Sequence, residues 1–374
     1  MTRPLIPLAR DHIEEADVLE VLSCLRGGWL TMGPRTAELE LALARWLAVS
    51  HAVALSTGTA AFLLACRTVA IAGGEVIVPA LARAAVAQAV NAAGGHLVLA
   101  DVVSPEEPIL DHRDVERRIT RRTRAVVVSH PWGYPADATA LRALCDANGL
   151  ALIEDATAAL GAVLADDPRA VGTIGEVGCF SLASGRQVGV GAGGVLVSDD
   201  EAITDRARTL RSHALTSTTW ERHRGHAETY DVVDIGFNFR IDEPRAVLAL
   251  AHLPRLEGEV QARRTADGRY REHLRSVPKL APCFDEGRGD RASPLAFPLL
   301  ARDATARIAV ADRLARDGVL TGRGCTLRPP SHSAAAPPAA AETAARLLVL
   351  PLHPWSDPAE QDVILSALRQ ATTS

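Results

Sequence analysis

The chain has 374 residues, 48% of them hydrophobic, which is enough for a large core and suits one sizeable α/β domain with a smaller appendage. A formal net charge of −5 gives no basic field for nucleic acid or an anionic membrane. The first residues lack a long apolar segment, so we expect no signal peptide, no membrane helix and a cytoplasmic location. Six widely spaced cysteines without a Cys-x-x-Cys pair predict free, mostly buried thiols and no metal site.

The N-terminal part alternates predicted helices and short apolar strands. Helices are expected over 14–25, 35–47, 60–72, 83–93 and 137–148, the last with Asp137 as N-cap, and strands over 52–55, 75–79, 96–101 and 124–130. A Gly-bearing turn, Ser56–Thr59, joins the first of these strands to its helix. Such a turn is the usual design of a phosphate site, although many are structural connectors. His130, alone at a strand end, is interpreted as a hydrogen-bonded structural residue.

Residues 151–198 carry the chemistry that the rest of the chain is expected to position. The apolar run from Ala151 ends in the acids Glu154 and Asp155, a pattern typical of a buried parallel strand. Such a strand brings a carboxylate to the carboxyl edge of the sheet, where ligands bind. Asp155 is therefore a candidate site residue. The whole chain contains a single lysine, Lys279.

The C-terminal part begins with a predicted helix over 200–211 and a polar connection over 213–226. A long helix from Glu243 to about Leu274 is expected to bridge into a smaller domain. The Pro- and Ala-rich run 328–341 is interpreted as a loop or linker. We therefore expect a large domain over 1–250 and a small C-terminal domain over 251–374.

Several motifs together resemble the DegT/StrS-type sugar aminotransferases, which depend on pyridoxal phosphate (PLP). The resemblance covers nearly the whole chain, with its motifs at 27–33, 154–156, 178–181, 236–240 and 344–353. It implies the type I fold of PLP-dependent transferases: an α/β fold with a mostly parallel central sheet flanked by helices, and a smaller C-terminal α/β domain. It also implies a homodimer with shared active sites.

The same resemblance implies roles for individual residues. Positions expected to bind the cofactor are Thr59, Ala60 and Ser181 at its phosphate, Arg83 at its ring, Asp155 at its pyridine nitrogen, and Asn238 at the phosphate of the neighbouring subunit. Asp155 and Arg186 are the candidate catalytic residues. Four positions depart from the family pattern: Arg186 replaces the Schiff-base lysine, Arg83 the aromatic that stacks on the ring, Ala158 a glutamine and Ala192 a glutamate. Arginine cannot form an aldimine, because its guanidinium stays protonated.

Three hypotheses follow from these departures. In the first, the protein binds pyridoxamine phosphate (PMP) or PLP non-covalently and acts on a sugar-like substrate, in a sugar or secondary-metabolite pathway, without being a standard transaminase. In the second, the protein has dropped the cofactor, and Arg83 and Arg186 bind the carboxylate or phosphate of an anionic substrate. In the third, the chain is a non-catalytic partner subunit of an active relative. Whether the chain is an enzyme at all stays open between them.

Overall fold

The computed structural model describes residues 5–165, 169–215, 231–277, 279–323, 336–354 and 358–373. Its larger part is built on a seven-stranded sheet with the order β1-β7-β6-β5-β4-β2-β3. The strands are β1 (His51–Leu55), β2 (Glu75–Pro79), β3 (His96–Ala100), β4 (Thr123–Ser129), β5 (Ala151–Asp155), β6 (Val177–Ser181) and β7 (Gly194–Ser198). Within this sheet β7 runs antiparallel to both neighbours and the other pairs are parallel.

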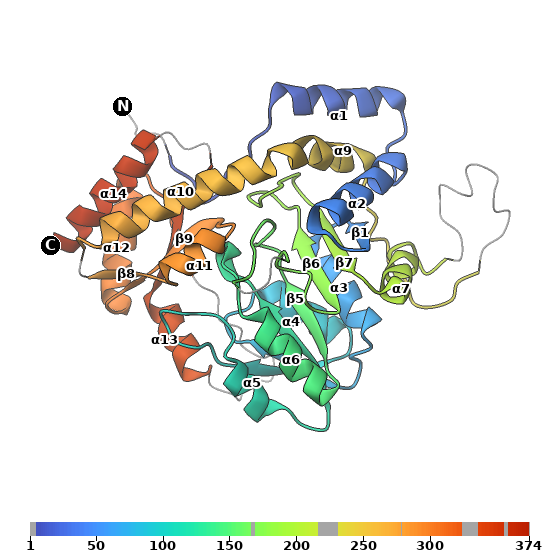
Figure 1. The fold of residues 1–374 in the computed structure, drawn as a ribbon. Coiled ribbons are helices and arrows are strands. Elements are labelled where there is room, and N and C mark those ends of the chain that lie inside the picture. Colours follow the sequence, from blue (N-terminus) through green and yellow to red (C-terminus); the bar gives the residue numbers. More distant parts are fainter. Residues whose placement is uncertain are drawn as a thin grey trace.

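Helices cover both faces of this sheet, so its central strands are buried on each side (Figure 1). In β4, Val126 and Val128 belong to one hydrophobic cluster, while Ala125 and Val127 belong to the other, as the two-residue period of a strand requires. This double burial explains why the strands are short, nearly continuous apolar runs. The helices of this part are α1 (Glu15–Gly27), α2 (Pro34–Leu47), α3 (Gly58–Thr68), α4 (Ala84–Ala92), α5 (His112–Arg118), α6 (Ala138–Asn148), α7 (Glu201–Arg211) and α9 (Glu243–His252).

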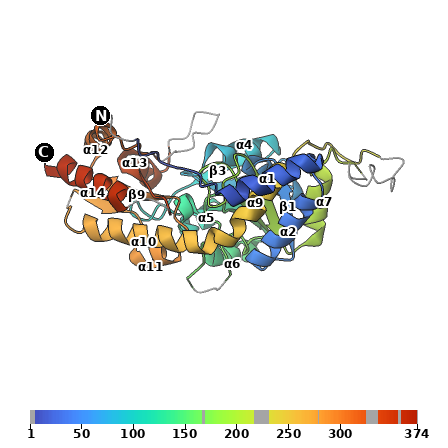
Figure 2. The same cartoon turned by 90° about the horizontal axis from the view of Figure 1, so that it is seen from above.

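A smaller antiparallel sheet with the order β10-β9-β8 forms the C-terminal part. Its elements are α10 (Leu256–Leu274), β8 (Leu280–Pro282), α11 (Glu286–Arg291), β9 (Ala296–Ala301), α12 (Ala304–Arg316), α13 (Pro338–Arg346), β10 (Leu347–Pro351) and α14 (Pro358–Thr373). Helix α10 packs Val260 into the core of the large part and Tyr270 into the C-terminal core, so it joins the two. Figure 2 shows α12 and α14 at one end of the molecule and α2 and α7 at the other.

The predicted elements agree closely with the structure, with three differences. The long helix expected from Glu243 is interrupted by a 3-10 turn at Leu253–Arg255, where Pro254 lacks an N–H for the helical ladder. Helix α13 begins inside the run predicted as a linker, of which residues 328–335 lie outside the described residues. Asp137 occupies the N-cap position of α6, but its side chain pairs with Arg288 instead of capping.

Other expectations are met only in part by what the structure describes. Four of the five described cysteines are buried, all five are free, and Cys325 lies outside the described residues. Residues 216–226 of the predicted polar connection also lie outside them. Within the described ranges, no helix is both long and apolar enough to cross a membrane. The domain boundary at residue 250 stays a prediction, and Ile6 packs in the C-terminal hydrophobic cluster.

Candidate functional site

The carboxyl ends of neighbouring parallel strands bring the polar residues of the site together. Ser129 at the end of β4 lies opposite Asp155 at the end of β5, which lies opposite Cys179 in β6. Arg83 precedes α4, in the turn that follows β2, and reaches across to β5. The strand order β5-β4-β2 therefore places a carboxylate and a guanidinium in contact, although the two residues are 72 positions apart.

Asp155 is buried, with 4% of its side chain exposed, and both of its oxygens have donors. Arg83 Nη2 donates to Oδ1 over 3.2 Å, and the Thr157 backbone N–H donates to the same oxygen over 3.2 Å. The Thr157 hydroxyl adds a short hydrogen bond to Oδ1. Ser129 Oγ lies 3.4 Å from Oδ2. The charge of Asp155 is thus compensated inside the protein by the Arg83 guanidinium.

Arg186 follows β6 in a turn that its backbone N–H closes by donating to the Ala183 carbonyl over 3.1 Å. Within the described part of the chain its guanidinium makes no hydrogen bond or ion pair, and its buried Nε has no acceptor. Burial and the neighbouring charge of Arg83 lower the pKa of Arg186 to about 10, while the Asp155 carboxylate acts in the opposite direction. The group is therefore protonated at neutral pH, and it is a largely desolvated cation that no described residue pairs by a hydrogen bond.

Arg83, Asp155 and Arg186 line one cavity of about 260 Å³. Its volume is slightly below the range of about 300–1,000 Å³ that is usual for ligand pockets. The large part contributes the edge of the sheet and Trp132, and the other walls come from the N-terminal and C-terminal segments. The remaining lining residues include Leu8, Ala9, Leu81, Ala82, Ser129, His130, Thr157, Ala158, Gly185, Leu295, Ala296, Gly322, Arg323 and Val349.

The residues expected at the cofactor phosphate lie at the start of α3 and do not line this cavity. Thr57, which the sequence analysis did not single out, is the N-cap, and its Oγ1 accepts the Ala60 N–H over 3.0 Å. Ser181 packs against Gly58 so closely that a Cβ added there would lie 2.9 Å from the Cβ of Ser181. Thr59 is exposed at the same helix start. Backbone and hydroxyl donors at this turn could hold a phosphate.

Asn238 is exposed and lies in a segment beside the same turn, because the Ser56 N–H donates to the Phe239 carbonyl over 2.7 Å. Phe237 and Phe239 stack with their ring centroids 4.7 Å apart and fix the segment. A role for Asn238 in a neighbouring subunit stays a prediction.

His130 is a buried structural residue, as its isolated position at a strand end suggested. Its Nδ1 accepts the Ala136 N–H over 3.0 Å, so Nε2 carries the proton and donates to Glu154 over 3.1 Å. Glu154 also accepts the N–H groups of Gly172, Ile174 and Gly175. These donors hold the pKa of Glu154 below its usual range in spite of its burial. Neither ring nitrogen of His130 is left to act as a base.

Gln187 fixes the turn that carries Arg186, and the sequence alone did not reveal this. Its buried Nε2 donates to the carbonyls of Ala158 and Ser293, over 2.7 Å each. Ala158, expected where the family has a glutamine, therefore contributes its backbone here.

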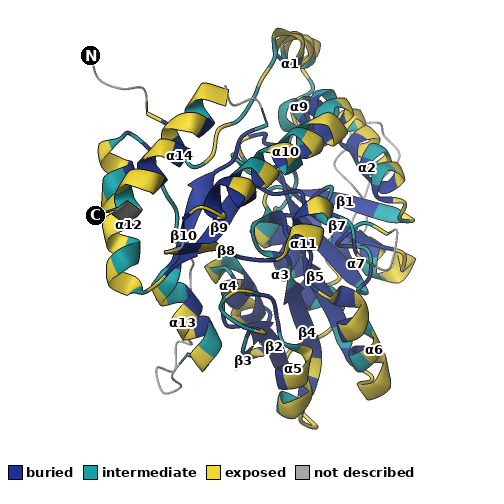
Figure 3. Cartoon of the chain, turned by 60° about the vertical axis from the view of Figure 1, so that its left-hand side comes forward, coloured by how far each residue is buried: buried dark blue, intermediate teal, exposed yellow. Residues whose placement is uncertain are grey.

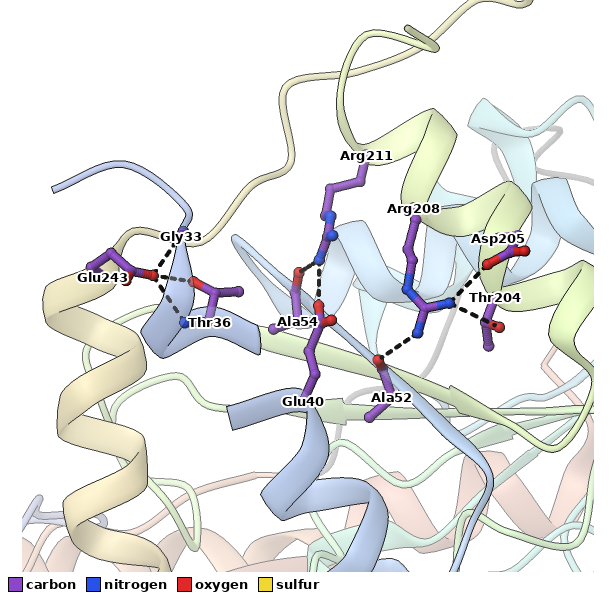
Figure 4. A network of polar contacts seen from close by, with 10 residues as sticks. All are labelled: Gly33, Thr36, Glu40, Ala52, Ala54, Thr204, Asp205, Arg208, Arg211 and Glu243. Carbon is purple, nitrogen blue, oxygen red and sulfur yellow. Dashed lines mark hydrogen bonds and ion pairs between the residues drawn. The ribbon is translucent and has the colours of Figure 1, made fainter. Parts of the chain in front are cut away.

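The buried side chain of Glu243 binds the Gly33 end of the Gly27–Gly33 loop (Figure 4). The carboxylate of Glu243 accepts the backbone N–H of Gly33 over 2.9 Å and both the N–H and the hydroxyl of Thr36. It therefore caps the start of α2 with a negative charge, which the helix dipole favours. This end of the loop is fixed in one conformation against α9.

Comparison with known proteins gives consistent matches. A model of the DegT/DnrJ/EryC1/StrS aminotransferase family matches residues 11–369. The spore coat polysaccharide biosynthesis protein SpsC of Bacillus subtilis (strain 168) is 31% identical over 76% of this chain and 73% of its own. A UDP-N-acetyl-3-dehydro-alpha-D-glucosamine 3-aminotransferase of Acidithiobacillus ferrooxidans is 33% identical over 86% of this chain and 85% of its own. The aminotransferase TlmJ from Streptoalloteichus hindustanus superposes with a TM-score of 0.91 at 28% identity, covering 99% of both chains.

The fold is the type I fold of PLP-dependent aminotransferases, as the sequence predicted. The chain belongs to the DegT/DnrJ/EryC1/StrS aminotransferase family, whose members among its relatives are sugar aminotransferases.

The cofactor of this family does not fit the cavity at its ring end. A pyridinium nitrogen needs the carboxylate of Asp155, which here is buried and already bonded to Arg83, Thr157 and Ser129. Arg186 offers no free amine for a covalent link. The start of α3 with Ser181 would suit a phosphate, but that feature alone suits any phosphorylated ligand. No catalytic step through the cofactor follows from this arrangement.

Proposed function

We propose that this chain acts in the biosynthesis of a sugar or a sugar-containing secondary metabolite, without the internal aldimine of a standard transaminase. The observation that carries the proposal is the Arg186 guanidinium in the cavity beside Asp155. The single lysine, Lys279, is exposed between α10 and β8 and is not among the described residues that line the cavity. A nucleophilic amine is therefore not available where the chemistry would require it.

The relatives support a sugar-like substrate. One of them is named for a UDP-linked amino sugar and another for polysaccharide biosynthesis. We propose a homodimer with shared sites and a cytoplasmic location, in keeping with the family. The exposed Asn238 and the exposed apolar side chains of Val232, Val233 and Ile235 beside it support a subunit contact at this surface.

The charges of the cavity support the hypothesis of an anionic substrate over that of a non-covalently bound PMP or PLP. Non-covalent PMP or PLP would have to displace Arg83 from Asp155 to reach its usual ring partner. An anionic substrate would instead leave that ion pair intact and give Arg186 an acceptor that no described residue supplies. We therefore propose an anionic ligand in this cavity and no bound cofactor.

The test is to add PLP to the purified protein, record absorbance, and treat the mixture with borohydride before peptide mass analysis. We expect no imine band and no modified peptide that contains residues 183–187. Modification of Lys279 alone would be a reaction at an exposed amine and agrees with the proposal. Amino transfer from glutamate to a keto sugar, with cofactor bound in the cavity, would overturn it.

A further inference from the structure

We propose that the cavity between Arg186 and Trp132 binds an acidic sugar, with its carboxylate or phosphate on Arg186 and its ring on Trp132, while Arg83 replaces the cofactor nitrogen as the partner of Asp155. This inference rests on the proposed function, because it requires that the cavity be free of a covalent cofactor. It adds to that function the chemical class of the ligand and a residue for each part of it.

Arg186 supplies the anion contact. A guanidinium carries five N–H donors in a planar fork that matches the two oxygens of a carboxylate or phosphate. In the described residues none of these donors has an acceptor, and Nε is fully buried. Leaving a buried charge unpaired is costly, so a ligand anion would be bound more strongly here than at an exposed arginine.

Arg83 makes the cavity positive without competing for the anion. Its Nη2 neutralises Asp155, and 38% of its side chain stays exposed to the cavity and solvent. Among the described residues, the charged side chains that line the cavity are the guanidinium groups of Arg83, Arg186 and Arg323 and the carboxylate of Asp155. The excess of positive charge attracts an anion and disfavours a cation such as a free amino sugar.

Trp132 provides a rigid wall for a ring. Its backbone has φ 52° and ψ 14°, a left-handed conformation that is unfavourable for a bulky residue and that often occurs at ligand sites. The Leu295 N–H donates to its carbonyl over 2.8 Å, and its indole lies 6.5 Å from the ring of Phe284. These contacts fix the indole against one side of the cavity. An indole face packs well on the apolar C–H face of a sugar.

The size of the cavity limits the ligand to one ring. A volume of about 260 Å³ lies below the usual range for whole nucleotide or drug-sized ligands. The side chains of Leu8, Leu81, Leu295 and Val349 form aliphatic parts of the described wall and carry no acceptor for a cation. A single sugar ring with one acidic group therefore matches the shape, polarity and charge of this cavity.

The experiment is calorimetric titration of the full-length protein at low salt with glucuronate, glucose 6-phosphate, glucose and inorganic phosphate. We expect either acidic sugar, or both, to bind at least about tenfold more tightly than glucose. Arg186→Gln should weaken acidic-sugar binding by about 10- to 100-fold, the range for a buried hydrogen bond to a charged group. Trp132→Ala should weaken acidic-sugar binding but leave inorganic phosphate unaffected. Trp132→Phe, which keeps a ring, should recover part of the affinity.

The matched control is Arg302→Gln, because Arg302 is exposed and pairs with its neighbour Asp303 far from the cavity. It should leave every affinity unchanged. Equal binding of glucose and the acidic sugars, or acidic-sugar binding that Arg186→Gln leaves unchanged, would overturn the inference. If no acidic sugar binds and PLP forms no imine in the cavity, the inference is wrong but the proposed function stands. If PLP forms an imine with a residue of the cavity, both the inference and the proposed function are wrong.

Discussion

Replacing Arg186 by methionine should stabilise the ligand-free protein. The substitution keeps an unbranched side chain and removes a charge that has no partner among the described residues. Burial and Arg83 lower the pKa of Arg186 from the ordinary value of an exposed arginine to about 10. At about 1.4 kcal/mol for each pKa unit, the folded environment disfavours the charged form by about 3 kcal/mol. That figure already includes the attraction of Asp155; because methionine fills less volume than arginine, we expect a net gain of about 1–2 kcal/mol.

The free-energy cost of burying the charged Arg186 depends on pH in one direction. The folded pKa lies below the unfolded one, so the cost of the buried cation is present at every pH below about 10 and diminishes only above it. The gain from Arg186→Met should therefore be constant across the neutral range. A protein of 374 residues has an unfolding entropy of about 2.1 cal/mol/K per residue, so 1–2 kcal/mol corresponds to a rise in Tm of about 1–3 °C.

The assay is thermal unfolding in a buffer without phosphate or carboxylate, with Arg302→Met as the control for losing an exposed arginine. An added acidic sugar should raise the Tm of the wild type and leave that of Arg186→Met unchanged, because a ligand stabilises only a state that binds it. A loss of more than about 1 kcal/mol in the ligand-free variant would refute the reasoning, since the guanidinium would then be satisfied within the folded protein.

Three further outcomes are expected. Glu154→Gln should lower the free energy of unfolding, measured by urea titration, by about 3–5 kcal/mol. The reason is that an amide cannot accept all the N–H groups now bonded to the buried carboxylate. A loss below about 1 kcal/mol would contradict this hydrogen-bond network. Arg186→Lys should give little aldimine absorbance with PLP. The double variant Arg186→Lys with Arg83→Phe should give more, because the loss of Arg83 frees Asp155. Equal absorbance in both variants would refute competition between Arg83 and the cofactor for the Asp155 carboxylate. Sedimentation should show a dimer, and a stable monomer at micromolar concentration would argue against the shared site around Asn238.

The fold was predictable because burial on both faces leaves a strong pattern in the sequence. Runs such as Glu75–Pro79 and Ala151–Asp155 are strands in the structure with those bounds. In Figure 3 the strands of both sheets are almost entirely buried, whereas the outer faces of the helices are exposed. Parallel strands with this pattern bring their carboxyl ends to one edge, so Asp155 could be placed there from its position alone.

The contacts of the site were less predictable, because they depend on strand order and on turns. The sequence places Arg83 at the ring position of the cofactor or on a substrate anion, whereas the structure pairs it with Asp155, because β4 alone separates their strands. Thr157 had a local signal, since a hydroxyl two residues after an aspartate commonly bonds that carboxylate. Trp132 had none, because its left-handed backbone follows from contacts with a segment more than a hundred residues away.

Two arginines in one cavity support a rebuilt site over a merely decayed one. A bias from lysine to arginine runs through the whole chain and could by itself explain Arg186, since it conserves charge. That bias does not explain Arg83, which stands where the family has an aromatic residue and therefore adds a charge. The added charge lies close enough to Arg186 to lower its pKa, so it destabilises the empty cavity. Asp155 pairs with Arg83, and among the described residues no acceptor pairs with Arg186, so a ligand anion would compensate that guanidinium. Arg83→Phe alone should therefore weaken binding of an acidic sugar and not restore transamination.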